Sequence, residues 1–168
     1  MKLQTIFLTG LYILDSFLTM GQDIQMKSNA KSASVILFIC EHGAARSTIA
    51  AAYFNKFARE QGLNYQAIFR GNNPDSILAP AAKNGLVKDG FDVTGWKPSP
   101  VSNHDIENAY LVVTLDCVLS GKDSTSKHIT KWKDISSISD DYTVARDEIV
   151  KKVQALVTEL SQKNKEQK

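Results

Sequence analysis

Short apolar runs alternate with amphipathic stretches along the central part of the chain. Residues 35–39 and 110–115 are mostly apolar, which predicts two strands buried in a parallel sheet. Between them, residues 47–61 repeat apolar side chains at helical spacing, which predicts a helix with one face against the core. Strands that alternate with helices predict an α/β domain whose parallel sheet is covered by helices on both faces.

Weaker patterns predict the remaining elements. Residues 65–69 and 129–132 predict two further strands, the second at an edge of the sheet. Residues 80–89 predict a short helix, because a proline at the start and a glycine after the end are typical of helix boundaries. A last helix is predicted to begin at Ser139, with two aspartates in its first turn.

The two ends of the chain differ from this core. Residues 1–21 combine an early lysine, apolar runs and small residues near the end, which predicts a secretory signal and export to the periplasm or beyond. Asp15 opposes this prediction, and the alternative is a cytoplasmic protein that starts at a later methionine. A polar linker is expected over 22–34, the α/β domain over 35–160 and a polar tail over 161–168.

Composition narrows the classes of function. The 168 residues are 43% hydrophobic and 23% charged, values typical of one folded domain. The net charge of +2 gives no reason to expect nucleic acid as a partner. The two cysteines, Cys40 and Cys117, cannot build a disulfide framework, and the three histidines lack the spacing of a zinc site. No metal or organic cofactor is expected.

The first loop of the predicted domain carries a nucleophile and a cation. Cys40 follows the first strand, and Arg46 and Ser47 open the first helix. Backbone N–H groups of such a loop can surround a tetrahedral oxyanion, and the helix N-terminus adds a positive field. Arg46 can bind two oxygens with its planar fork. The residues between them, also expected to bind substrate, are Glu41, His42, Gly43, Ala44 and Ala45.

The same field supports a reactive cysteine. A positive environment favours the thiolate of Cys40, the nucleophilic form. Ser47 is expected to bind substrate and to donate a hydrogen bond to the sulfur when it becomes a leaving group. The small residues 43–45 leave the concave side of the loop open for an anion.

The chain resembles the low-molecular-weight protein tyrosine phosphatase superfamily, which also contains thioredoxin-coupled arsenate reductases. The likeness covers roughly 35–160. The matching motifs, in the family's order, are 40–47, 50–51, 70–73, 90–93 and 140–142. His42, Ala44 and the segment 97–101 are more similar to the reductase branch. The resemblance implies a single domain with a four-stranded parallel sheet flanked by helices.

Two departures from the family concern the loop and the general acid. The family usually has a bracing asparagine where Gly43 stands. Its phosphatases also carry an acid in an Asp-Pro dipeptide, and this sequence has no Asp-Pro. Asp134 lies near that position and is expected to protonate the leaving group, the alternative being a solvated loop carboxylate. Asp140 and Asp141 are interpreted as helix caps, and they are the other residues that can supply the acid.

Cys117 raises the question of a redox reaction. The resemblance implies that a reductase would need a resolving cysteine near this place, but Cys117 is displaced by one residue and no third cysteine exists. A buried thiol at the end of a strand is the simpler interpretation. A reductase cycle would then depend on an external thiol.

Three functions remain open at the level of sequence. The first is a phosphatase for a phosphorylated protein or a small phosphate, with Cys40, Arg46 and Asp134 as catalytic residues and a phosphocysteine intermediate. The second is an arsenate reductase that uses the same loop with Cys117 or an external thiol. The third is a weakly active module that binds an oxyanion or phosphotyrosine.

Overall fold

The computed structural model describes residues 32–119 and 128–166. The chain divides into two units, 1–30 and 31–168, and every described residue belongs to the second. The expected signal, and the expected linker up to residue 31, therefore lie outside the described residues. Within the described part, no helix has the length and apolar character needed to cross a membrane.

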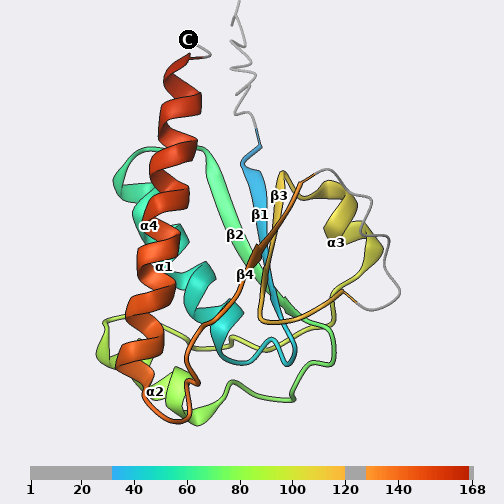
Figure 1. Cartoon of the computed structure of the whole chain (residues 1–168), viewed down its shortest axis with the longest axis vertical. Helices are drawn as coiled ribbons and strands as arrows, with labels where there is room; N and C mark the ends of the chain where they lie inside the picture. Colours follow the sequence, from blue (N-terminus) through green and yellow to red (C-terminus); the bar gives the residue numbers. More distant parts are fainter. Residues whose placement is uncertain (1–31, 120–127, 167–168) are drawn as a thin grey trace, which may run out of the picture. The chain divides into compact units, whose positions relative to one another are not determined.

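A four-stranded parallel sheet forms the centre of the domain, as the resemblance implied (Figure 1). The strand order is β2-β1-β3-β4, and all three pairings are parallel. The strands are β1 (Ser34–Cys40), β2 (Tyr65–Gly71), β3 (Leu111–Leu115) and β4 (Ile129–Trp132). Residues 36–39 of β1 are completely buried because strands flank them on both sides and helices cover them on both faces. Its last residue, Cys40, pairs with Gly71 at the carboxyl edge of the sheet.

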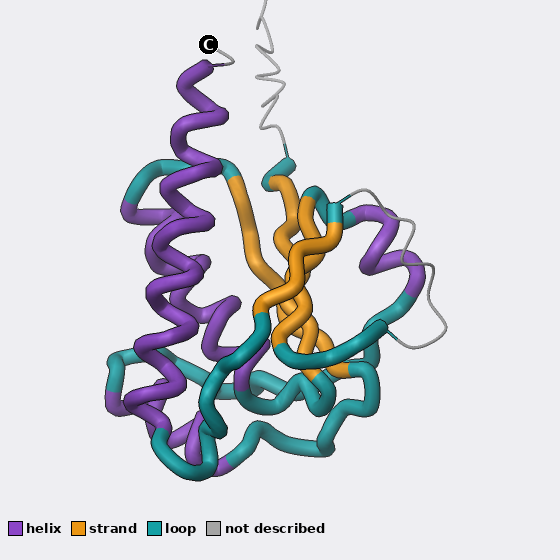
Figure 2. The backbone as a smooth tube through the Cα atoms, in the orientation of Figure 1, coloured by secondary structure: helices purple, strands orange, loops and turns teal. Residues whose placement is uncertain are grey.

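Helices cover the two faces of this sheet (Figure 2). They are α1 (Arg46–Glu60), α2 (Pro80–Lys88), α3 (Asn103–Asn108) and α4 (Tyr142–Glu166). Ile36 and Phe38 of β1 face the core that contains α1 and α4, and Leu37 and Ile39 face the smaller core under α3. This split follows from the alternation of side chains along a strand. The α/β prediction with helices on both faces is confirmed.

Two helical elements differ from the sequence prediction. The last helix begins at Tyr142 and not at Ser139, because the Asp141 carboxylate accepts hydrogen bonds from the N–H groups of Thr143 (2.8 Å) and Val144 (3.2 Å) and so caps the helix. This helix continues to Glu166. Helix α3 was not predicted; it is a short helix of six residues whose start is set by a capping box from Ser102.

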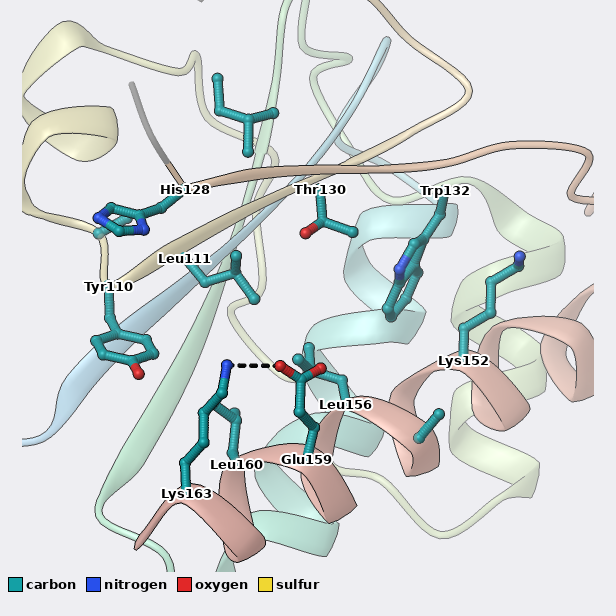
Figure 3. Close-up of a pocket in the computed structure, with 13 residues that line it drawn as sticks. Tyr110, Leu111, His128, Thr130, Trp132, Lys152, Leu156, Glu159, Leu160 and Lys163 are labelled. Carbon is teal, nitrogen blue, oxygen red and sulfur yellow. Dashed lines mark hydrogen bonds and ion pairs between the residues drawn. The ribbon is translucent and has the colours of Figure 1, made fainter. Parts of the chain in front are cut away.

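An open groove separates the middle of α4 from the edge of the sheet (Figure 3). Its volume is about 720 Å³, with Leu111, Trp132 and Leu156 among the apolar side chains that line it. The Glu159–Lys163 ion pair, at 2.6 Å, lies on its α4 side. The groove includes the first residues of β3 and β4, so much of it lies toward the end of the sheet opposite Cys40.

Candidate active site

Cys40 ends the central strand and faces the start of α1. It is 5% exposed, and its Sγ lies 3.1 Å from the Ser47 hydroxyl, within hydrogen-bonding distance for sulfur. Ser47 is fully buried in the first turn of α1. The predicted partnership of these two residues is therefore present, and it places the sulfur next to a hydroxyl that can stabilise a leaving thiolate.

The carbonyl groups of residues 40–45 all accept hydrogen bonds. Four of these carbonyls accept hydrogen bonds from backbone N–H groups of the segment 72–79. The bonds run from Asn72 to Cys40 (3.3 Å), Asn73 to Glu41 (2.9 Å), Asp75 to His42 (3.1 Å) and Ala79 to Ala44 (2.9 Å). The Gly43 and Ala45 carbonyls accept from the Thr48 hydroxyl and the Ile49 N–H, both at 3.0 Å.

This arrangement determines where the loop N–H groups point. The C=O of one residue and the N–H of the next point in opposite directions across a trans peptide, and the described residues contain no cis peptide. Because the carbonyls of residues 40–45 are all bonded to partners in the segment 72–79 or in α1, the N–H groups of residues 41–46 point away from those partners. Such a set of N–H groups is a binding site for an oxyanion. We call the loop 40–47 the cradle.

Glycine at position 43 suits the cradle for a steric reason. Gly43 has a φ of +60°, and a Cβ added there would lie 2.8 Å from the Gly71 nitrogen. A Cβ on Gly71 would in turn lie 2.7 Å from the Gly43 nitrogen. The family's asparagine would therefore not fit here without a shift of β2. The bonds to 72–79 and the Thr48 hydroxyl brace the loop instead.

Arg46 connects the cradle with the segment after β4. Its Nη2 donates to the Ile135 carbonyl (3.3 Å), and its Nε lies 3.8 Å from Oδ2 of Asp116. The Nε atom is buried and has no hydrogen-bond partner among the described residues. The Arg46 side chain is thus held by one hydrogen bond and one long ion pair, and it retains donors for an anion.

Asp116 is a residue of the site that the sequence analysis missed. It directly follows β3, has a φ of +48°, and its carboxylate accepts hydrogen bonds from the N–H groups of Asp134 (2.9 Å) and Ile135 (3.1 Å). Its carboxylate also approaches Arg46, so Asp116 connects the end of β3 with the cradle and with the segment after β4. A carboxylate at the carboxyl end of a parallel strand was the available signal, since ligand sites in such sheets lie at that edge.

Asp134 lies on the segment that Asp116 and Arg46 hold. The residue is exposed and has a φ of +61°, and no described residue donates a hydrogen bond to its carboxylate. Its backbone position next to the cradle agrees with an acid role, which stays a prediction. Asp141 is occupied as the cap of α4, whereas Asp140 is an exposed residue just before it.

Cys117 contacts the backbone of β1 next to the nucleophile. Its Sγ donates to the carbonyl of Ile39 at 3.4 Å, and the residue is partly buried. Burial, with a further contribution from nearby Cys40, raises the pKa of the Cys117 thiol to about 11. Cys117 is therefore a protonated thiol near neutral pH, and it lies against the residue that precedes Cys40.

The outer rim of the cradle is charged. His42 Nδ1 lies 3.5 Å from an Asp75 carboxylate oxygen, with both side chains more than half exposed. The Asn72 amide donates to a Glu41 carboxylate oxygen (3.2 Å) and to the Val118 carbonyl (2.8 Å). These contacts connect the cradle, the segment 72–79 and the segment after β3, so residues from all three surround the entrance.

Comparison with known families defines the class of protein. A model of the family described as low molecular weight phosphotyrosine protein phosphatase matches residues 35–135, more than half of the chain. The chain belongs to this family. A search of curated proteins found no match.

Solved structures confirm the fold, and they include proteins described as arsenate reductases and as an arginine phosphatase. A thioredoxin-dependent arsenate reductase of Corynebacterium glutamicum is 24% identical, with a TM-score of 0.66 over 80% of this chain and 65% of that chain. The chain thus spans about 65% of that reductase. YwlE of Bacillus subtilis is 22% identical, with a TM-score of 0.68 over 76% of this chain and 99% of YwlE. An arsenate reductase of Archaeoglobus fulgidus is 28% identical, with a TM-score of 0.59 over 73% of this chain and 98% of that chain.

Proposed function

We propose that this protein is a cysteine-dependent phosphatase that hydrolyses phosphate monoesters through a phosphocysteine. The hydrogen bonds that engage all six carbonyls of residues 40–45 carry this proposal, because they turn the N–H groups of residues 41–46 away from those partners, where these groups can bind an oxyanion that Cys40 attacks. A structure of a YwlE arginine phosphatase with a phosphorylated active-site serine, 22% identical with a TM-score of 0.67, supports phosphoryl transfer to a side chain in this fold.

The first step is transfer of the phosphoryl group to sulfur. The Cys40 thiolate attacks phosphorus, a sulfur–phosphorus bond forms, and the phosphorus–oxygen bond to the leaving group breaks. Asp134 gives its proton to the leaving oxygen. Arg46 and the cradle N–H groups bind the equatorial oxygens, whose charge they stabilise throughout the transfer.

The second step returns the enzyme to its starting state. A water molecule attacks phosphorus and gives a proton to the Asp134 carboxylate, and the phosphorus–sulfur bond breaks. Ser47 stabilises the departing thiolate, since its hydroxyl is 3.1 Å from the sulfur. Inorganic phosphate leaves, and Cys40 and Asp134 have their initial protonation states.

Arsenate reduction is the second candidate, and the position of Cys117 favours it. This thiol reaches the carbonyl of the residue before Cys40, so a chain movement at the end of β3 would bring the two sulfurs together. Against it, the raised pKa of Cys117 disfavours the thiolate that must attack. The phosphatase needs no second cysteine, which is why it is the first proposal.

Parallel assays of the full chain test the proposal. One assay measures hydrolysis of p-nitrophenyl phosphate, and the other measures arsenite formation from arsenate with thioredoxin or a small thiol. We expect phosphate ester turnover that Cys40→Ser abolishes, while inorganic phosphate still binds to this variant with similar affinity. Thiol-dependent arsenite formation without ester hydrolysis would support the reductase, and phosphate binding without either turnover would leave only a binding module.

A further inference from the structure

A second pocket shares a wall with the cradle. It has a volume of about 770 Å³ and is lined by residues 76–78, by part of α2 and by residues 91–97. The first of these segments is attached to the cradle at both ends, through the Asp75 N–H to the His42 carbonyl and the Ala79 N–H to the Ala44 carbonyl. The wall of the pocket is therefore continuous with the rim of the cradle. We call it the side pocket.

Aromatic residues fixed by the core form one side of this pocket. The Trp96 ring packs on Phe69 of β2, with 5.8 Å between ring centroids. The Phe91 ring packs edge-on against Tyr53 of α1 at 4.9 Å. Both lining rings are partly exposed, so each has one face against the core and surface left for a ligand.

The turn that carries Trp96 is held by its own hydrogen bonds. The Asp92 carboxylate accepts from the Thr94 N–H at 2.9 Å, and the Trp96 N–H donates to the Val93 carbonyl at 3.1 Å. Gly95 within the turn has a φ of +74°, which a glycine adopts without strain. A ligand would meet a pocket wall that is already formed, which lowers the entropic cost of binding.

The rim of the side pocket combines exposed apolar groups with positive charge. Ile77 and Val87 are 68% and 55% exposed, unusual values for large aliphatic side chains. Lys83 and Lys97 are also exposed on the lining. Its one carboxylate, on Asp92, already binds the Thr94 N–H. The surface therefore complements an apolar side chain that has an acidic neighbour.

We propose that the side pocket binds the polypeptide of a phosphorylated protein substrate, next to the phosphorylated residue in the cradle. The proposal rests on the phosphatase function and adds to it a subsite for an apolar residue with an acidic neighbour beside the phosphorylated residue. A small phosphate would occupy the cradle alone. An extended peptide advances about 3.3 Å per residue, so a side chain a few positions from the phosphorylated residue can enter a pocket that shares the cradle's rim.

Matched peptides test this subsite. In a series of phosphotyrosyl peptides, each peptide carries one Leu-Glu pair, and the pair is moved stepwise along the positions before and after the phosphotyrosine. Each has a reference peptide with Ser-Lys in place of Leu-Glu. We expect the best Leu-Glu peptide to exceed its reference about tenfold in kcat/KM, as one apolar contact can provide. Val87→Ser, and Lys83→Glu combined with Lys97→Glu, should bring this ratio close to one. The kcat/KM for p-nitrophenyl phosphate should stay within about twofold of the parent, because this substrate does not reach the pocket.

Controls on α4 use the same changes elsewhere on the surface. Val144→Ser replaces another exposed valine, and Lys151→Glu reverses another exposed lysine. Both should retain the preference of the parent for the Leu-Glu peptide. A preference that survives the side-pocket variants, or a parent without any preference, would overturn the inference.

Peptide binding separates this inference from the phosphatase function. Fluorescence anisotropy measures the Kd of the same labelled peptides on Cys40→Ser, with and without the pocket changes. If the parent hydrolyses no ester but the pocket changes remove the binding preference, the phosphatase proposal fails and the peptide site stands. If the pocket changes slow only arsenate reduction with thioredoxin, the pocket serves a protein reductant and the inference is wrong.

Discussion

The Asp116 carboxylate accepts a hydrogen bond from the backbone N–H of Asp134 at 2.9 Å, across 18 residues of sequence. The same carboxylate accepts from the Ile135 N–H and approaches the Arg46 guanidinium. Asp116 thus holds the backbone of the expected acid, Asp134, and the Arg46 guanidinium near each other. The conformation of Asp134, with its positive φ, depends on this support.

Loss of this support should slow the proposed phosphatase reaction. We expect Asp116→Ala to lower kcat for p-nitrophenyl phosphate about 10- to 100-fold, since hydrogen bonds to a charged group contribute about 1.5–3 kcal/mol. Asp92→Asn is the control, as it alters another carboxylate that holds a turn. Equal loss in both variants would contradict a specific role for Asp116.

The acid role of Asp134 predicts a dependence on the leaving group. Asp134→Asn should slow the cleavage of phenyl phosphate by about 10²–10⁴, because the departing phenoxide then lacks its proton donor. Esters with more acidic leaving groups should lose less. The same series on Asp140→Asn should show no such trend. A uniform loss across esters for Asp134→Asn would show that Asp134 is not the acid, and a trend for Asp140→Asn would identify that residue instead.

Close contact between Gly43 and Gly71 predicts a stability effect. Gly43→Ala should lower the free energy of unfolding through backbone strain, roughly 1–2 kcal/mol, and through overpacking, roughly 1–3 kcal/mol. Gly62→Ala is the matched control, because Gly62 has a φ of +63° and open space around it. Urea unfolding measures both variants. Equal losses would mean that the Gly71 backbone moves without cost.

The partly buried network around Asp89 predicts sensitivity to acid. Although burial opposes ionisation, hydrogen bonds from Tyr142 (2.5 Å) and Tyr53 (2.8 Å) and the nearby Arg146 guanidinium lower the pKa of Asp89. A carboxyl whose pKa is lower in the folded state stabilises the fold above its unfolded pKa, about 3.9, and loses this contribution as pH falls through the folded pKa.

Asp89→Asn should therefore weaken the dependence of stability on acid pH. We expect the unfolding free energy of the parent to fall more between pH 6 and pH 3 than that of Asp89→Asn. At pH 6 the variant should be the less stable of the two, because the three donors lose a charged acceptor. Denaturant unfolding at both pH values provides the comparison, and parallel pH curves would contradict it.

The sequence alone was sufficient to predict β1, α1 and the cradle between them. An apolar run of the length of one buried strand, followed by a loop and then by apolar residues at helical spacing, predicts a strand, a loop and a helix in that order. Cys40, Arg46 and Ser47 all lie within these eight residues of loop and helix start, 40–47. Their proximity in space therefore follows from proximity in sequence. The same reasoning located Asp134 only approximately, because its segment has no regular periodicity.

Only the tertiary structure decided which distant residues complete the site. Asp116 is local neither to Arg46 nor to Asp134; it reaches both because parallel pairing brings the carboxyl ends of β1, β3 and β4 to the same edge. The contact of Gly43 with Gly71 depends in the same way on the pairing of β1 with β2. The pattern of apolar residues specifies that strands are buried, but their order and register arise from packing between segments that are far apart in the chain.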